Sequence, residues 1–171
     1  MRLKMISAMA AALLLAACAS DEAATTDNAN AGGGTTTNNG ITQGAVTPGS
    51  AEDFQQNVGD RVFFDTDRYD LSAEAQSQLQ KQAAWLAQYP AVTVTIEGHC
   101  DERGTREYNL ALGERRANAV ANYLTALGVD AGRLSVISYG KERPQCTESN
   151  ESCWAQNRRG VTTISGGAAS S

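Results

Sequence analysis

The residues best equipped for chemistry lie in one stretch, residues 97–104, which reads EGHCDERG. It contains the only histidine of the chain, one of its four cysteines, three carboxylates and an arginine. Such a group could form a Cys–His catalytic pair, a metal site, or a place where a charged ligand is bound.

A catalytic role for His99 and Cys100 is disfavoured because the two residues are adjacent. If a strand runs through them, their side chains point to opposite faces and cannot act as nucleophile and base for each other. A metal site needs further ligands, and the sequence has neither a CxxC pair nor a second histidine. We therefore predict no metal and no cofactor, a half-buried apolar Cys100, and a His99 bonded to a neighbouring loop.

The charged residues offer a binding site instead. Asp101 lies at the mouth of the loop, and Asn109, Gly113 and Arg116 follow at spacings that place them on one face of a helix. A carboxylate on the loop and a guanidinium on the helix could hold a zwitterion, the one accepting from an ammonium and the other donating to a carboxylate. The alternative is that Asp101 and Arg116 simply pair with each other, and spacing alone leaves both open.

The elements that must position these residues follow from the period of the apolar side chains. Ser72 is the predicted N-cap of a first long helix that ends at Pro90, and a second helix from Thr105 is predicted to stop at Gly128. The predicted strands are residues 61–64, 92–96, 134–139 and 161–164, with a short helix before the last of them. This order predicts an α+β fold: a mixed four-stranded sheet with helices packed mainly on one face.

The chain begins with a segment typical of export. Arg2 and Lys4 precede an apolar run that is too short to span a bilayer and ends in small residues, so residues 1–17 are predicted to be a signal peptide. The sequence LAAC at its end resembles the lipobox of bacterial lipoproteins, in which the cysteine carries the acyl chains. Cys18 is therefore the predicted lipid anchor, and Ala19, in place of the aspartate that favours the inner membrane, implies the outer membrane.

The remaining boundaries follow from composition. Residues 18–50 are rich in Gly, Thr, Asn and Ala and are predicted to be a disordered tether. Residues 51–165 form the predicted folded domain, and residues 166–171 a flexible tail. The chain has 14 basic and 19 acidic side chains, a balance that argues against binding nucleic acid through a basic patch.

The sequence from residue 60 to residue 164 closely resembles the OmpA-like peptidoglycan-binding domains, and among them those of peptidoglycan-associated lipoproteins. The resemblance is carried by the runs EGHCDERGTREYNLALGERRANAVANYL, VFFDTDRYDLS, SYGKERPQC and NRRGV. It implies that Asp101 and Arg116 bind the amino and carboxylate ends of diaminopimelate in the peptidoglycan stem peptide. It also implies that Asn109 supports this pocket and that Phe64 and Asp65 form its other wall.

Other arginines also match the pattern. Arg115 competes with Arg116 for the carboxylate, but Arg116 directly precedes Ala117 and lies seven residues after Asn109, as the motif requires. Asn157 and Arg158 are further, weaker candidates for the site.

The sequence departs from the family pattern at three positions: Cys100, Gly113 and Gly160. Gly113 weakens the helix by roughly 1 kcal/mol and is expected to clear space beside the pocket. Gly160 replaces an apolar residue, which predicts a late start for the last strand. None of the three removes a charge from the proposed site.

Cys146 and Cys153 are predicted to form a disulfide, because an exported domain meets an oxidising compartment. Two free thiols are the alternative.

The predicted function is non-catalytic: the protein would bind the wall and tether the outer membrane to it through the lipid on Cys18. The family resemblance further implies TolB and other Tol proteins as partners. A scaffold that binds such partners without touching the wall is an alternative, as is an enzyme acting on peptidoglycan.

Overall fold

The computed structural model describes residues 46–170. The predicted signal peptide, Cys18 and most of the predicted tether therefore lie outside the described residues. The elements are α1 (Ala51–Asp53), η1 (Phe54–Val58), β1 (Arg61–Phe63), α2 (Ala73–Gln88), β2 (Thr93–His99), α3 (Arg106–Ala126), η2 (Ala131–Arg133), β3 (Leu134–Gly140), α4 (Glu151–Asn157) and β4 (Arg159–Gly166).

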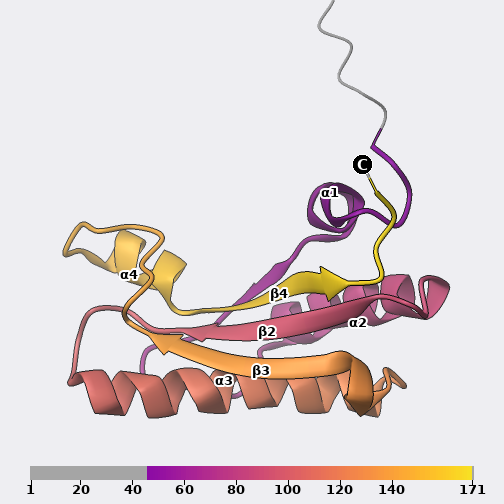
Figure 1. The fold of residues 1–171 in the computed structure, drawn as a ribbon. Coiled ribbons are helices and arrows are strands. Elements are labelled where there is room, and N and C mark those ends of the chain that lie inside the picture. The colour runs from indigo at the N-terminus through magenta and orange to yellow at the C-terminus, as the bar shows by residue number, and fades with distance from the viewer. Residues whose placement is uncertain (1–45, 171) are drawn as a thin grey trace, which may run out of the picture. The chain divides into compact units, whose positions relative to one another are not determined.

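The four strands form one mixed sheet in the order β1-β4-β2-β3 (Figure 1). β4 lies antiparallel to both of its neighbours, β1 and β2, whereas β2 and β3 are parallel. The parallel pair is joined by α3, which runs along the sheet in Figure 1, as a parallel connection requires. The predicted fold class is confirmed.

The two long helices begin where the sequence predicts. The hydroxyls of Ser72 and Thr105 accept hydrogen bonds from the backbone N–H groups of Ala75 and Tyr108, so each residue caps its helix. Gly128 follows α3 with a φ of 98°, the left-handed conformation that favours glycine at such a stop.

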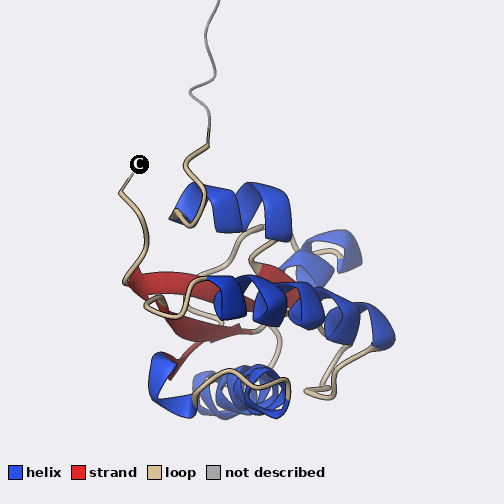
Figure 2. Cartoon of the chain, turned by 90° about the vertical axis from the view of Figure 1, so that its right-hand side faces the viewer, coloured by secondary structure: helices blue, strands red, loops and turns tan. Residues whose placement is uncertain are grey.

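The core lies between one face of the sheet and helices α2 and α3 (Figure 1, Figure 2). Alternate residues of β2, Val94 and Ile96, are buried there, whereas Thr93, Thr95 and Glu97 are only half-buried. From the helices, the core receives the apolar stripes predicted by the 3.6-residue period: Ala75, Leu79, Ala83 and Leu86 of α2, and Ala117, Val120 and Leu124 of α3.

Two glycines allow α3 to approach the sheet backbone to backbone. A Cβ on Gly98 of β2 would overlap the carbonyl of Gly113 in α3, and a Cβ on Gly113 would overlap the hydroxyl of Ser138 in β3. Gly113 therefore serves helix–sheet packing, and the expectation that it clears space beside the pocket is wrong. This contact fixes the depth at which α3 lies under the loop after β2.

The ends of the fold differ from the expected boundaries. The helical residues 51–58 were not predicted as an element, and Ser50, expected in the tether, is buried and caps α1. At the other end β4 extends to Gly166, and the N–H of Ala169 donates to the carbonyl of Gly49 at 3.1 Å. A backbone hydrogen bond thus joins the beginning of the folded part to its end.

The predicted late start of the last strand is also wrong. β4 begins at Arg159, and Gly160 pairs with Val62 on one side and Gly98 on the other. A Cβ there would lie 3.2 Å from Cγ2 of Val120, so this position is crowded rather than irregular. No helix in the described part of the chain is both long and apolar enough to span a membrane.

Candidate functional site

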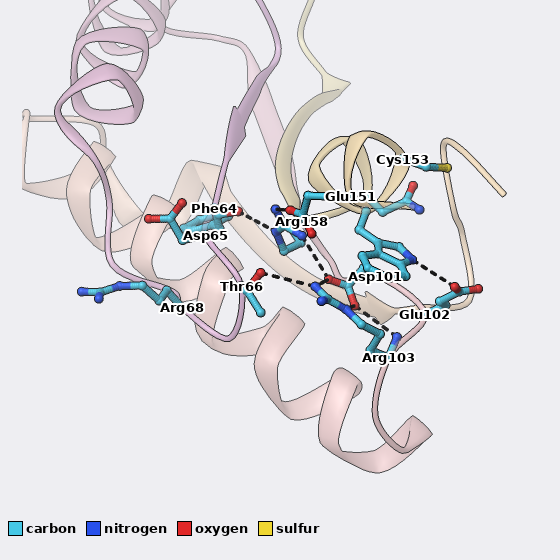
Figure 3. Close-up of polar contacts among 12 residues, drawn as sticks. Phe64, Asp65, Thr66, Arg68, Asp101, Glu102, Arg103, Glu151, Cys153 and Arg158 are labelled. Carbon is cyan, nitrogen blue, oxygen red and sulfur yellow. Dashed lines mark hydrogen bonds and ion pairs between the residues drawn. The ribbon is translucent and has the colours of Figure 1, made fainter. Parts of the chain in front are cut away.

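Asp101 lies in the loop after β2, separated from the strand by Cys100, and is the centre of an ion-pair cluster (Figure 3). Its carboxylate accepts from Nε and Nη2 of Arg103 at 3.1 and 2.6 Å, and from the backbone N–H of Arg103 at 3.1 Å. Nη1 of Arg158 lies 3.4 Å from the same carboxylate. Asp101 is therefore held by a loop arginine on one side and by an arginine that follows α4 on the other.

This environment keeps Asp101 ionised. Burial alone would raise the pKa of Asp101, but the hydrogen bonds from Arg103 and Arg158 outweigh burial and hold that pKa below its ordinary value. The side chain of Asp101 is only 9% exposed. A buried carboxylate that stays charged is suited to binding a cation.

Arg116 on α3 is fully buried and braces the loop after β1 and the end of β2. Its guanidinium donates to the carbonyls of Arg68 at 2.8 Å, His99 at 2.9 Å and Asp65 at 3.0 Å. Burial lowers the pKa of Arg116 from its ordinary value, but an arginine remains charged at neutral pH. The alternative that Asp101 and Arg116 pair with each other is not what the structure shows, because Asp101 has Arg103 and Arg158 as its ionic partners.

A cavity of about 330 Å³ lies where the predicted charges meet. It is lined by Thr66, Asp67, Cys100, Asp101, Arg103, Gly104, Tyr108, Asn109, Leu112 and Arg116. The structure therefore brings Asp101, Asn109 and Arg116 to one hollow, which combines the buried carboxylate of Asp101 and the exposed one of Asp67 with two guanidiniums. Such a hollow can receive a small group that carries both charges.

Asn109 lines the cavity and also shapes it. Its side-chain amide donates to the carbonyls of Arg103 at 2.7 Å and Thr105 at 3.0 Å. Lys141 holds the same loop from outside by donating to the carbonyls of Glu102 and Gly104. The loop that carries Asp101 is thus fixed from two sides.

Phe64 and Asp65 do not line this cavity. They act from behind: the carbonyl of Asp65 accepts from Arg116, the carbonyl of Phe64 accepts from Arg158 at 3.0 Å, and the Phe64 ring lies 5.2 Å from the Arg116 guanidinium. Phe64 and Asp65 instead line a second hollow, of about 800 Å³, beside β1. The wall that sequence reasoning assigned to them is formed by the next two residues, Thr66 and Asp67.

Sequence reasoning missed Arg103 and gave Arg158 too little weight. Arg103 could have been found from its position two residues after Asp101, since an aspartate side chain often accepts from the backbone N–H two residues on. The contact between Arg158 and Asp101 spans 57 residues of sequence, and no local signal predicts it. Trp154 was also missed; the Arg103 guanidinium lies 4.2 Å from its ring centre, and its indole N–H donates to Glu102.

His99 and Cys100 face different elements. Nε2 of His99 lies 3.3 Å from Glu97 on the same strand, rather than bonding a neighbouring loop as expected, and its ring packs beside Tyr139. Cys100 is fully rather than half buried, and its thiol donates to the carbonyl of Asn109 at 3.3 Å. Within residues 46–170, no three histidine, cysteine or carboxylate side chains gather closely enough to hold a metal ion.

Cys146 and Cys153 are joined in a disulfide, with their Cα atoms 5.2 Å apart. Cys153 lies in α4, the helix that also carries Trp154 and the Arg158 partner Glu151 (Figure 3).

Comparison with known proteins places this geometry in context. The OmpA family model matches residues 63–158. A peptidoglycan-associated lipoprotein of Rhizobium meliloti (strain 1021) is 58% identical over 127 residues, which cover 74% of this chain and 72% of that protein. One from Haemophilus influenzae is 47% identical over 66% of this chain and 72% of its own length.

Solved structures agree with these sequence relatives. The crystal structure of the peptidoglycan-associated lipoprotein from Burkholderia pseudomallei superposes with a TM-score of 0.64 at 38% identity, covering 68% of this chain and 100% of that one. The C-terminal domain of Helicobacter pylori MotB, at 21% identity and a TM-score of 0.59, shares the fold alone.

Proposed function

This chain belongs to the OmpA family, and from that membership we propose that its folded part binds peptidoglycan without covalent attachment. The names of the relatives from Rhizobium meliloti and Burkholderia pseudomallei support this ligand. The observation that carries the proposal is the cavity itself, in which the buried, ionised Asp101 and two guanidiniums are held within one small hollow.

The proposed ligand group is the end of diaminopimelate in the stem peptide, which carries an ammonium and a carboxylate on one carbon. Asp101 would accept from the ammonium, and Arg116 would donate to the carboxylate. Asn109 would keep the loop in place, and the carbonyls of Phe64 and Asp65 would hold the arginines that surround the ligand. No step of bond cleavage is part of this role, so the protein is proposed to be a binder rather than an enzyme.

The rest of the chain would turn binding into attachment. A lipid on Cys18 would hold the protein in the outer membrane with the folded part facing the periplasm, and the tether would span the distance to the wall. TolB and other Tol proteins are the proposed protein partners. Both assignments rest on the family and on the sequence outside the described residues.

Co-sedimentation with purified peptidoglycan tests the proposal. Full-length protein in detergent should pellet with the wall, and Asp101→Asn should weaken binding by about ten- to a hundred-fold, since a charge-assisted contact contributes roughly 1.5 to 3 kcal/mol. Glu114→Gln, which removes an exposed carboxylate of α3 away from the cavity, is the matched control and should pellet like the wild type.

Arg116 is better replaced by lysine than by alanine, because the buried guanidinium braces three carbonyls and its loss would confuse folding with binding. If wild type and Asp101→Asn pellet alike, the cavity is not the wall-binding site. If the wild type stays in solution, the protein is a partner-binding scaffold and the Tol proteins become the ligands to test.

A further inference from the structure

The carboxylate of Asp101 is already saturated by two arginines of the protein itself. Arg103 contributes two side-chain hydrogen bonds and a backbone N–H, and Arg158 approaches from the opposite side. An ammonium from a ligand cannot reach this carboxylate unless one of the two guanidiniums moves.

The two arginines differ in how firmly they are held. Arg158 has a side chain 7% exposed and is fixed by the carbonyl of Phe64 at 3.0 Å and by Glu151 at 2.6 Å. Arg103 has a side chain 40% exposed; beyond Asp101 it contacts only the hydroxyl of Thr66 at 3.3 Å and the face of Trp154. Arg103 is therefore the partner that can be exchanged.

Only the side chain of Arg103 needs to move. Its carbonyl is held by Asn109 at 2.7 Å, and its neighbours Glu102 and Gly104 are held by Lys141. Arg103 also lines the cavity, so after leaving Asp101 its side chain would still be next to whatever the cavity contains.

Charge decides which ligand can replace it. A ligand that offers only an ammonium adds a positive charge to a cavity that Arg103 and Arg116 already line, and it brings no anion for the displaced Arg103 guanidinium. The other carboxylate on the lining, that of Asp67, already accepts from the hydroxyl of Tyr108. A ligand with an ammonium and a carboxylate on one carbon adds no net charge, and its carboxylate gives the displaced guanidinium a new partner.

Resting on the proposed function, we propose that Arg103 lies where the ligand's ammonium must bind, is displaced by it, and then pairs with the ligand's carboxylate. Arg103 is thereby a specificity-determining residue. It favours stem peptides with diaminopimelate at the third position over stem peptides with lysine there, because lysine lacks the second carboxylate.

The test is calorimetric titration of the full-length protein in detergent with two matched tripeptides. Both are L-Ala-γ-D-Glu peptides, one with meso-diaminopimelate and one with L-lysine at the third position. The wild type should prefer the first by about tenfold or more. In Arg103→Gln, diaminopimelate binding weakens and lysine binding strengthens, so the ratio of the two dissociation constants falls about tenfold.

Arg106→Gln is the matched control, because it removes the same charge three residues away from an exposed side chain that pairs with Glu142 and does not line the cavity. Its ratio should stay within about twofold of the wild type. Fluorescence gives a second readout: diaminopimelate should change the tryptophan emission of the wild type and not that of Arg103→Gln, since only in the wild type does a guanidinium leave the ring of Trp154. The other tryptophan, Trp85, is buried in the core and contributes a constant background.

An unchanged ratio in Arg103→Gln, or a wild type that binds the lysine peptide equally well, overturns this inference while leaving wall binding intact. A wild type that binds neither peptide, with Asp101→Asn behaving alike, overturns the proposed function and this inference together. A loss of folding in Arg103→Gln would show as a lowered melting temperature. In that case the ratio of the two dissociation constants is measured in Arg103→Lys, which keeps the charge but cannot form two parallel hydrogen bonds.

Discussion

Several arginines of this protein act as braces for the backbone. Arg116 donates to three carbonyls, and Arg133 donates to the carbonyls of Leu86, Tyr89 and Val92. A buried guanidinium is costly unless its donors are satisfied, and each carbonyl it satisfies would be costly without it. At such positions an arginine can be essential for folding and for binding at once, and the two roles have to be separated by experiment.

Arg116→Ala should therefore destabilise the fold itself. Three carbonyls lose their donor, which we expect to cost about 3 kcal/mol in the free energy of unfolding. Urea denaturation measures this, with Arg115→Ala as control: Arg115 is exposed and lies over the ring of Tyr69, so its loss should cost less than about 0.5 kcal/mol. Equal costs for the two variants would contradict the bracing role.

His99 should make stability depend on pH. Burial, followed by the charge of Arg159, lowers the pKa of His99 from 6.5 to about 4, with Glu97 opposing and Arg143 reinforcing the shift. Between these values the unfolded chain binds more protons than the folded one, so stability is complete above about pH 6.5 and falls as the pH drops toward 4.

The measurement is the free energy of unfolding from pH 7 to pH 5, above the range in which most carboxylates titrate. Because His99 is the only histidine, His99→Gln should flatten the slope in this window. A slope that the substitution leaves unchanged would assign the effect to other groups.

At the residue scale the sequence predicted those members of the site whose spacing or motif marks them. Asp101, Asn109 and Arg116 do gather around one cavity. Phe64 and Asp65, predicted to form a wall of the pocket through side chain and backbone, do not line the cavity; their carbonyls accept from Arg158 and Arg116. Arg103 was missed although its position two residues after Asp101 signals the backbone hydrogen bond between them; the second contact, from its guanidinium, carries no such local signal.

At the scale of elements, α3 is placed by the contact between Gly98 and Gly113. Gly98→Ala should destabilise the protein by about 2 to 3 kcal/mol, because its Cβ would overlap the backbone of Gly113 and force the helix away from the sheet. Thermal unfolding measures this. Gly132→Ala in η2 is the control, since its Cβ would lie 3.1 Å from the exposed side chain of Asp130 alone; an equal loss there would argue against helix–sheet crowding.

The loop closed by Cys146 and Cys153 positions α4. On the chain-entropy model so small a loop stabilises the fold by about 2 to 3 kcal/mol, and Cys146→Ser with Cys153→Ser should lose this amount in urea. Intact mass with and without reductant should differ by about two daltons. No difference would mean that the protein carries two thiols at these positions. Cys100 is a free, buried cysteine, so it does not contribute to the mass difference.

The strands and long helices could be predicted because their apolar residues repeat with clear periods. The helical residues 51–58 could not, since they are short and owe their position to tertiary contacts: the Phe54 ring lies 4.9 Å from that of Trp85, whose indole N–H donates to Asp53. Arg159 as the start of β4 escaped prediction because its pairing partner, Phe63, is 96 residues earlier in the chain.

At the scale of the whole molecule, the proposed attachment depends on Cys18. Labelling growing cells with a radioactive fatty acid should mark the wild type and leave Cys18→Ala unlabelled. The labelled protein should fractionate with the outer membrane, since several acyl chains bind a bilayer far more firmly than one. If Cys18→Ala kept the label, the lipid would be attached to another residue and Cys18 would not be the anchor.

The hydrogen bond between Gly49 and Ala169 fixes the end of the sheet at which a pull on the chain at Gly49 would enter the fold. Gly49 bonds Ala169, three residues after Gly166, which pairs with Thr93 at the start of β2, whereas Asp101 lies beyond the opposite end of the same strand. A pull between the chain at Gly49 and a ligand at Asp101 therefore runs along the strands, across whose direction the ladder hydrogen bonds lie. Such a pull loads those bonds together in shear, so the sheet would resist tension as a unit rather than opening one bond at a time.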